Sequence, residues 1–215
     1  MTRCTPTAQD PVSACLSHST LTGAPPMGNA ERVVTLLGDP LTAGYGLKSA
    51  ESLPRQLAAR LASETPLVRV IGAGVFGDTT GDGLQRLDRD VPAQTDLCVV
   101  ALGANDMMQL GPTDHVRDNL LSIIDKLHRR SIPILLCGMR APPWFGAYAW
   151  AFDAVYPEVA RAASVPLMPF LMEGVALQPA YVLPDRIHPN AAGVGKMADT
   201  LAPHVRSALA ALRTP

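Results

Sequence analysis

Four short segments of the sequence carry residues of the types that could do chemistry. Acyl transfer by a hydroxyl requires a base, a group that orients the base, and donors for a developing oxyanion. Each segment alone is also ordinary turn chemistry, because Gly-Asp and His-Pro-Asn are common in turns. The segments are Gly38-Asp39-Pro40-Leu41-Thr42, Gly74-Val75-Phe76-Gly77-Asp78-Thr79-Thr80, Leu102-Gly103-Ala104-Asn105-Asp106 and Asp185-Arg186-Ile187-His188-Pro189-Asn190.

Short apolar runs precede three of these segments and alternate with helical patterns. Such runs, ended by glycine or a turn, indicate buried strands. Their alternation with helices implies a parallel sheet with right-handed crossovers, and such sheets bind ligands at the carboxyl ends of the strands. We therefore expect an α/β fold, a three-layer α/β/α domain with a central five-stranded parallel sheet. The predicted strands are 33–37, 67–71, 97–102, 133–137 and a weaker one at 166–168.

Apolar residues at helical spacing predict the helices between the strands. One helix begins after Ser52, which can act as its N-cap, and has Pro54 in its first turn. Another begins at Thr113. A third covers 148–163 and is expected to be interrupted or kinked at Pro157, and an alanine-rich helix over 191–212 closes the chain.

Composition and charge exclude several classes of protein. The chain has 215 residues and a net charge of -1 with no basic block, so we expect no nucleic-acid partner. Its longest apolar runs are too short to cross a bilayer, so we expect no transmembrane segment. Cys98 and Cys137 fall in predicted buried strands, and without Cys-x-x-Cys or a histidine-rich cluster we expect no metal site.

The first thirty residues differ from the rest of the chain. They are rich in Thr, Ser, Pro and Ala and show no periodicity, so we expect a disordered extension over 1–30 and a single domain over 31–215. The extension lacks the continuous apolar segment of a secretory signal. We therefore expect a cytoplasmic protein.

In their order along the chain, the four segments resemble the signature blocks of the SGNH/GDSL hydrolases, which have a flavodoxin-like α/β/α fold. The similarity covers nearly the whole chain from Arg32 onward, and 41–46 with 77–80 resemble the branch of bacterial arylesterases and multifunctional thioesterase/lysophospholipases. The resemblance implies carboxylic ester hydrolysis of the Ser-Asp-His type, without metal or cofactor, on a small acyl or aryl ester. Aryl esters, thioesters and lysophospholipids stay open as substrates, and so does the oligomeric state.

The resemblance also implies a role for individual residues. His188 matches the base of the family, and Asp185 matches the carboxylate that orients the base. Gly77 would give a backbone N–H, and Asn105 a side-chain N–H, to the oxyanion hole. The alternative is structural: Asp185 and His188 shape the turn before the last helix, Gly77 is a turn residue with positive φ, and Asn105 is an Asx-turn residue.

Pro40 stands where the family has its nucleophilic serine. Proline has neither a hydroxyl nor an N–H, so the nucleophile and one oxyanion donor are both missing. Loss of the nucleophile typically reduces turnover by about a millionfold, and loss of one donor by about a hundredfold to a thousandfold. We therefore expect little or no ester hydrolysis, without rescue by Thr42, Thr79 or Thr80. Since proline suits the first turn of a helix, we expect the fold to tolerate it.

A loop rich in aromatic residues and proline runs from Arg140 to Trp150. Its Trp144, Phe145 and Tyr148, together with Met107 after the third strand, suit an acyl or aryl group. The alternative is that these side chains only anchor the loop to the core.

Two functional hypotheses follow. The first is an esterase or thioesterase scaffold that is inactive or severely impaired at its nucleophile. The alternative is a pseudoenzyme that binds an acyl or carbohydrate ligand without turning it over. A purely structural interaction protein would leave the joint presence of Asp185, His188, Asn105 and Gly77 unexplained.

Overall fold

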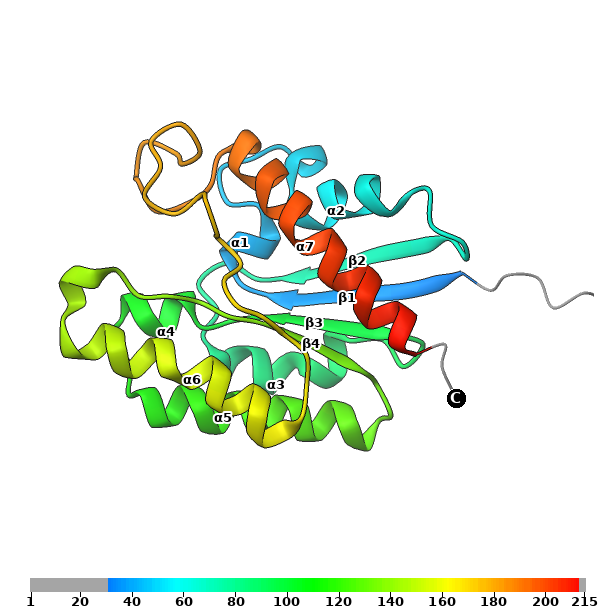
Figure 1. The fold of residues 1–215 in the computed structure, drawn as a ribbon, viewed down its shortest axis with the longest axis horizontal. Coiled ribbons are helices and arrows are strands. Elements are labelled where there is room, and N and C mark those ends of the chain that lie inside the picture. Colours follow the sequence, from blue (N-terminus) through cyan, green and yellow to red (C-terminus); the bar gives the residue numbers. More distant parts are fainter. Residues whose placement is uncertain (1–30, 213–215) are drawn as a thin grey trace, which may run out of the picture.

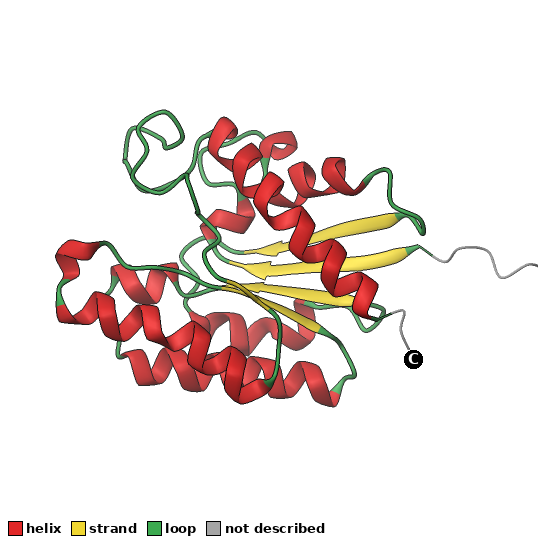
Figure 2. Ribbon diagram, viewed as in Figure 1, coloured by secondary structure: helices red, strands yellow, loops and turns green. Residues whose placement is uncertain are grey.

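The computed structural model describes residues 31–212, in which five parallel strands form one sheet between two layers of helices (Figure 1). The prediction for residues 1–30 lies outside the described residues. Figure 2 shows the strands converging on one edge, where the loops follow them. The predicted α/β fold with a five-stranded parallel sheet is confirmed. In sheet order the strands are β2 (Val68–Gly74), β1 (Arg32–Gly38), β3 (Leu97–Ala101), β4 (Ile134–Cys137) and β5 (Leu167–Met168).

The long helices divide between the two faces of the sheet (Figure 1). One face is covered by α2 (Leu53–Leu61) and α7 (Ala191–Ala211), which contact each other. The other face is covered by α3 (Thr80–Asp90), α5 (Thr113–Arg129) and α6 (Ala147–Ala163). Two short helices, α1 (Pro40–Ala43) and α4 (Ala104–Met108), follow β1 and β3, and 3₁₀ turns lie at Ser49–Glu51 and Pro143–Phe145.

The central strands are buried because helices cover both faces. Every residue of β3 is buried, which is why its sequence is a continuous apolar run without alternation. β2 extends beyond the predicted 67–71, because its register with β1 runs from Arg32↔Val68 to Gly38↔Gly74. Glycine and alanine at its end carry little strand signal of their own. The first two segments therefore begin level with each other.

Two helices differ from expectation. The helix α6 is not interrupted, because it continues through Pro157, which is exposed; a kink at this residue stays a prediction. The helix α3 was not predicted, although Thr79 and Asp82 form a capping box in which each side chain accepts from the backbone N–H of the other residue.

Within residues 31–212, no helix combines the length and the hydropathy that crossing a membrane requires. The same residues contain no group of three His, Cys, Asp or Glu side chains placed to hold a metal ion. Cys98 and Cys137 are free and buried, as predicted, and burial raises the pKa of both thiols to about 12.

Candidate active site

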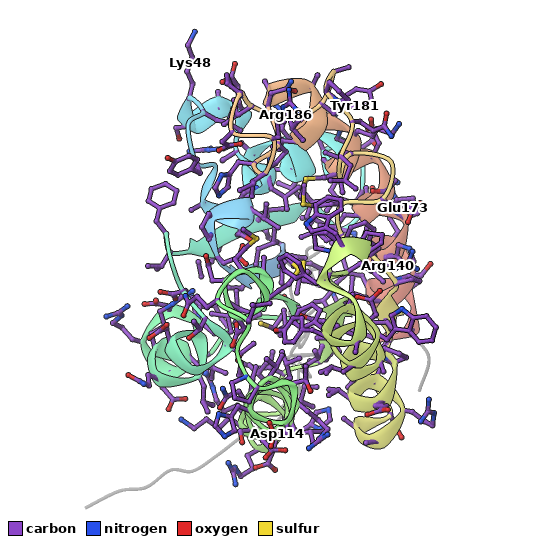
Figure 3. The ribbon with its side chains drawn as sticks, turned by 90° about the vertical axis from the view of Figure 1, so that its left-hand side faces the viewer. Lys48, Asp114, Arg140, Glu173, Tyr181 and Arg186 are labelled. Atoms are coloured by element: carbon purple, nitrogen blue, oxygen red, sulfur yellow. The ribbon has the colours of Figure 1, made fainter. Side chains whose placement is uncertain are left out.

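The first three segments lie at the carboxyl edge of the sheet because they directly follow β1, β2 and β3. Figure 1 shows this edge on the left, where the strand arrows end. Figure 3 looks onto the same end of the molecule, with Lys48 from the loop after α1 and Arg186 from the fourth segment both in the upper part of the view. Segments that are far apart in the sequence therefore share one end of the fold.

Pro40 is buried and is the first residue of α1. Asp39 caps this helix, since its Oδ1 accepts a hydrogen bond from the N–H of Leu41 at 3.0 Å. The first position of a helix has no intrahelical acceptor for its N–H, so proline fits there without loss of a hydrogen bond. The helix ends at Gly44, whose φ is 83° and whose N–H donates to the Pro40 carbonyl oxygen at 3.0 Å.

Asp39 supports this turn from inside the protein. Burial raises the pKa of its carboxyl to about 7, and backbone N–H groups, first that of Leu41, offset the effect only in part. Among the described residues, Oδ2 has no hydrogen-bond partner. A carboxyl without exposed surface cannot touch a substrate, so its role is structural.

Asp185 and His188 are paired within one turn. His188 Nδ1 lies 2.8 Å from Asp185 Oδ2, and Asp185 Oδ1 accepts from the N–H groups of Ile187 at 2.9 Å and His188 at 3.0 Å. Burial works to raise the pKa of Asp185, but the hydrogen bonds from Ile187 and His188 outweigh it and hold the pKa below its ordinary value. An ionised carboxylate at Nδ1 favours the tautomer with the proton on Nδ1, which leaves Nε2 able to accept one.

Tyr45 connects this pair to Pro40, although sequence analysis assigned it no role. Its backbone N–H donates to the Pro40 carbonyl oxygen at 3.2 Å. Its ring lies against the imidazole of His188, with the centroids 4.3 Å apart and the planes tilted by 32°. Tyr45 therefore contacts the Pro40 turn with its backbone and the imidazole with its ring.

Gly77 and Asn105 are connected through Asp78, which follows Gly77 in the chain and accepts a hydrogen bond from Asn105. The Asn105 amide donates to the Asp78 carbonyl oxygen at 2.8 Å, across 27 residues, so its side chain reaches the second segment. Gly77 has a φ of 82°, and a Cβ added to it would meet no protein atom within 4 Å. Backbone conformation, rather than crowding within the protein, therefore requires glycine here. Among the described residues the Gly77 N–H has no hydrogen-bond acceptor.

Arg86 is a buried residue of α3 that binds the ends of β1 and β2. Sequence analysis did not identify it. Its guanidinium donates to the carbonyl oxygens of Gly38 at 2.7 Å and Ala73 at 2.9 Å, and it pairs with Asp78 and with Asp90. Asp78 is thus held by Arg86 through its side chain and by Asn105 through its carbonyl. These two interactions of Asp78 also restrain the neighbouring Gly77.

Asp106 ties the third segment to the second. It is buried, and its two carboxylate oxygens accept from the backbone N–H and the hydroxyl of Thr80, both at 2.8 Å. Because Asp106 follows Asn105 directly, the bonds between Asp106 and Thr80 also hold the backbone of Asn105 in place. Sequence analysis quoted Asp106 in the segment but gave it no function.

The aromatic loop is divided between surface and core. Trp144 is 67% exposed, whereas Phe145, Tyr148 and Met107 are half-buried and pack against the core. The Tyr148 hydroxyl also donates to the Gly111 carbonyl oxygen at 3.0 Å. Anchoring therefore describes Phe145 and Tyr148, and Trp144 is the member of the predicted set that faces solvent.

A groove of about 570 Å³ lies beside this arrangement. Thr42 and Phe76 contribute to its walls, but Asp185, His188 and Asn105 do not. We assign no chemistry to this groove.

Comparison with known proteins gives a consistent result. The profile of the GDSL-like Lipase/Acylhydrolase family matches residues 36–195. An arylesterase of Vibrio mimicus is 34% identical over 163 residues, which cover 75% of this chain and 82% of the relative. Thioesterase 1/protease 1/lysophospholipase L1 of Escherichia coli is 34% identical over 175 residues, 80% of this chain and 83% of the relative. The crystal structure of TesA is similar with a TM-score of 0.78 and 31% identity, covering 82% of this chain and 99% of that one.

Proposed function

The chain belongs to the GDSL-like lipase/acylhydrolase family and has the scaffold of an esterase or thioesterase, and we propose that Pro40 fills the nucleophile position of this hydrolase and leaves it inactive or severely impaired. In this proposal His188 is the base and Asp185 orients it. Gly77 and Asn105 donate to the oxyanion. The substrate is a small acyl or aryl ester or a thioester, a class supported by the names of the arylesterase and thioesterase relatives.

One observation carries the proposal. The imidazole of His188 is held by Asp185 at 2.8 Å and lies against the ring of Tyr45 at a centroid distance of 4.3 Å, and the backbone N–H of Tyr45 is bonded to the Pro40 carbonyl oxygen. This chain of contacts supports the proposal, because it connects an oriented imidazole through Tyr45 to the turn of Pro40, a residue that has no hydroxyl to activate.

A serine at position 40 would supply the missing step. Its hydroxyl oxygen would bond to the ester carbonyl carbon while His188 Nε2 takes the proton, and the oxyanion would accept hydrogen bonds from Gly77 and Asn105. Collapse would break the bond to the alcohol or thiol, which leaves with the proton from His188. Water would then release the acid and regenerate serine by the same two stages. Proline cannot form the first bond.

The burial and hydrogen bonds of the nearby threonines support the proposal that none of them replaces the nucleophile. Thr42 is 1% exposed, and its Oγ1 lies only 2.0 Å from where a Cβ on Gly38 would be, so it points into the turn. Thr79 Oγ1 bonds to Asp82 Oδ2 at 2.6 Å in the cap of α3. Thr80 is fully buried against Asp106.

Hydrolysis of p-nitrophenyl acetate by three forms of the chain tests the proposal. We expect Pro40→Ser to exceed the unaltered chain at least about a thousandfold, since a nucleophile is worth about a millionfold and the serine also restores an N–H donor. Pro40→Ala is the matched control, because it restores the N–H without a hydroxyl. It should stay near the unaltered chain and take up no fluorophosphonate. Efficient turnover by the unaltered chain, or a fluorophosphonate adduct on it, would refute the proposal.

The pseudoenzyme is the second candidate. It is favoured by the fit of Pro40 to the start of α1, which costs the helix no hydrogen bond, together with the intact pair of Asp185 and His188. It predicts that Pro40→Ser stays inactive while the unaltered chain binds an acyl or carbohydrate ligand saturably. Gain of turnover in Pro40→Ser decides for the disabled hydrolase.

A further inference from the structure

Three rings from three separate loops form a row at the candidate site. The rings of Tyr45 and His188 lie against each other, with their centroids 4.3 Å apart and their planes tilted by 32°. Phe76 meets Tyr45 edge to face, at 5.8 Å and 84°. The edge-to-face arrangement of Phe76 and Tyr45 is one of the favourable ones for aromatic pairs. Tyr45 therefore links the loop after β2 to the turn that carries the base.

The presentation of Tyr45 is fixed by its own backbone. It lies between Gly44 and Gly46, whose φ values of 83° and 71° turn the chain sharply on both sides of it. Its N–H is bonded to the Pro40 carbonyl oxygen at 3.2 Å. The ring is nevertheless 46% exposed, so burial of apolar surface does not by itself account for its position.

The contact with Tyr45 complements the contact with Asp185. Asp185 binds the edge of the imidazole at Nδ1, which favours one tautomer while the ring stays in line with that hydrogen bond, but one bond alone does not prevent the ring from tilting out of line and losing it. Tyr45 covers a face of the imidazole, so it restrains this tilt. Among the described contacts, Asp185 and Tyr45 are the titratable groups that face the ring.

We propose that Tyr45 is a positioning residue that holds the plane of the His188 imidazole, with Phe76 supporting Tyr45 from the loop of Gly77. The inference rests on the proposed role of His188 as base. It assigns to the aromatic ring, and not to its hydroxyl, the task of aiming Nε2. Phe76 is 59% exposed and contacts Tyr45. The two rings thereby couple the base to the loop that carries the oxyanion donor Gly77.

Kinetics in the Pro40→Ser background provide the first test. Misplacement of a reacting group by about 1 Å can reduce the rate by about a hundredfold, so Tyr45→Leu should lower kcat by about tenfold to a hundredfold and leave KM within a few-fold. Tyr45→Phe keeps the ring and should retain the parent kcat within about threefold. Leu67→Ala, at the opposite end of the sheet, is the control for a general effect on the protein and should change neither constant. An unchanged kcat in Tyr45→Leu, or equal losses in the Leu and Phe variants, would overturn the proposal.

The second test needs no turnover and uses the unaltered chain. Nitrogen-15 NMR of the His188 ring reports its tautomer, which should be a single form with the proton on Nδ1 in the parent and in Tyr45→Phe. Tyr45→Leu should show a mixture of tautomers at neutral pH, because a tilted ring no longer keeps its bond to Asp185. A single unchanged tautomer in Tyr45→Leu rejects the positioning role even if Pro40→Ser gains no activity.

Phe76→Leu provides a second variant that tests the proposal if Tyr45→Leu fails to fold. It leaves both Tyr45 and His188 in place and should shift the same two measurements in the same direction, to a smaller extent. If neither measurement changes in Phe76→Leu while Tyr45→Leu is unfolded, the row of rings has no positioning role.

Discussion

The Arg86 guanidinium donates to the Gly38 carbonyl oxygen at 2.7 Å. A residue of α3 thus reaches the end of β1 at the point where the turn of Pro40 begins. The same guanidinium reaches the end of β2 at Ala73 and pairs with Asp78, so three parts of the candidate site share one buried charge.

Replacement of Arg86 by methionine should destabilise the protein severely. The change leaves Asp78 buried without its cation and several carbonyl oxygens without a donor, and loss of one partner of a buried ion pair costs about 3–5 kcal/mol. Urea unfolding measures the difference. Arg89→Met is the matched control, since the Arg89 side chain is 73% exposed and, within residues 31–212, pairs only with Asp90, so little change in stability is expected. Similar losses in the two variants would contradict the role of Arg86.

Replacement of Gly77 should reveal its backbone conformation. Alanine at a φ of 82° should reduce the free energy of unfolding by about 1–2 kcal/mol, and asparagine by less, because asparagine tolerates the left-handed region better. Gly81→Ala is a control of opposite sign, since Gly81 lies in α3 with room for a methyl group and alanine favours a helix. An equal effect of alanine at both positions would show that the φ of Gly77 is not enforced.

The stability of the protein should fall as the pH rises from about 4 to about 7 because of Asp39. The folded state holds this proton up to a pKa of about 7, whereas the unfolded chain releases it near 3.8. The folded state therefore binds more protons between these values, and the difference corresponds to at most about 4 kcal/mol. Asp90 has a pKa lowered to about 2 by hydrogen bonds from Arg89 and Arg86, so its contribution is lost only as the pH falls below about 4.

Asp39→Asn isolates the contribution of that one carboxyl. The variant should gain stability relative to the parent over the interval from about pH 4 to about pH 7 and then keep a constant difference above it. Denaturant titrations at several pH values measure this. A difference that does not vary with pH would show that Asp39 titrates normally in the folded protein.

Asp185→Asn should disable catalysis in the Pro40→Ser background. An amide at this position can stabilise the wrong tautomer of the base, which reduces kcat by about ten-thousandfold in a hydrolytic triad. KM should change little, because the carboxylate touches the base and not the substrate. A reduction below about tenfold, measured with p-nitrophenyl acetate, would remove Asp185 from the mechanism.

The sequence predicted those parts of the site whose signal is local. Apolar runs ending in glycine located the ends of β1 and β3, and Asp185 with His188 are close enough in the chain to pair within one turn. Parallel strands then bring such ends to one edge without further information.

Arg86 and Tyr45 could not be found in this way, because their partners are distant in the chain. Arg86 lies among polar residues of a helix and looks like a solvated side chain until the fold places Gly38 behind it. Tyr45 belongs to a segment that the sequence singled out, but its contact with His188 depends on how two loops meet. For Tyr148 the sequence left ligand contact and anchoring open; its hydroxyl bonds to the Gly111 carbonyl oxygen, which supports anchoring, and contact with a ligand stays a prediction.

A proline at the start of α1 also determines what a screen for well-behaved protein can detect. The ring restricts the denatured chain at a site whose native φ it already matches, which favours the native state by about 0.4–1 kcal/mol. Exchange for serine should therefore leave yield, solubility and melting temperature the same or slightly worse. Selection for robust expression would retain the proline form, and only an assay that counts product molecules would tell the two apart.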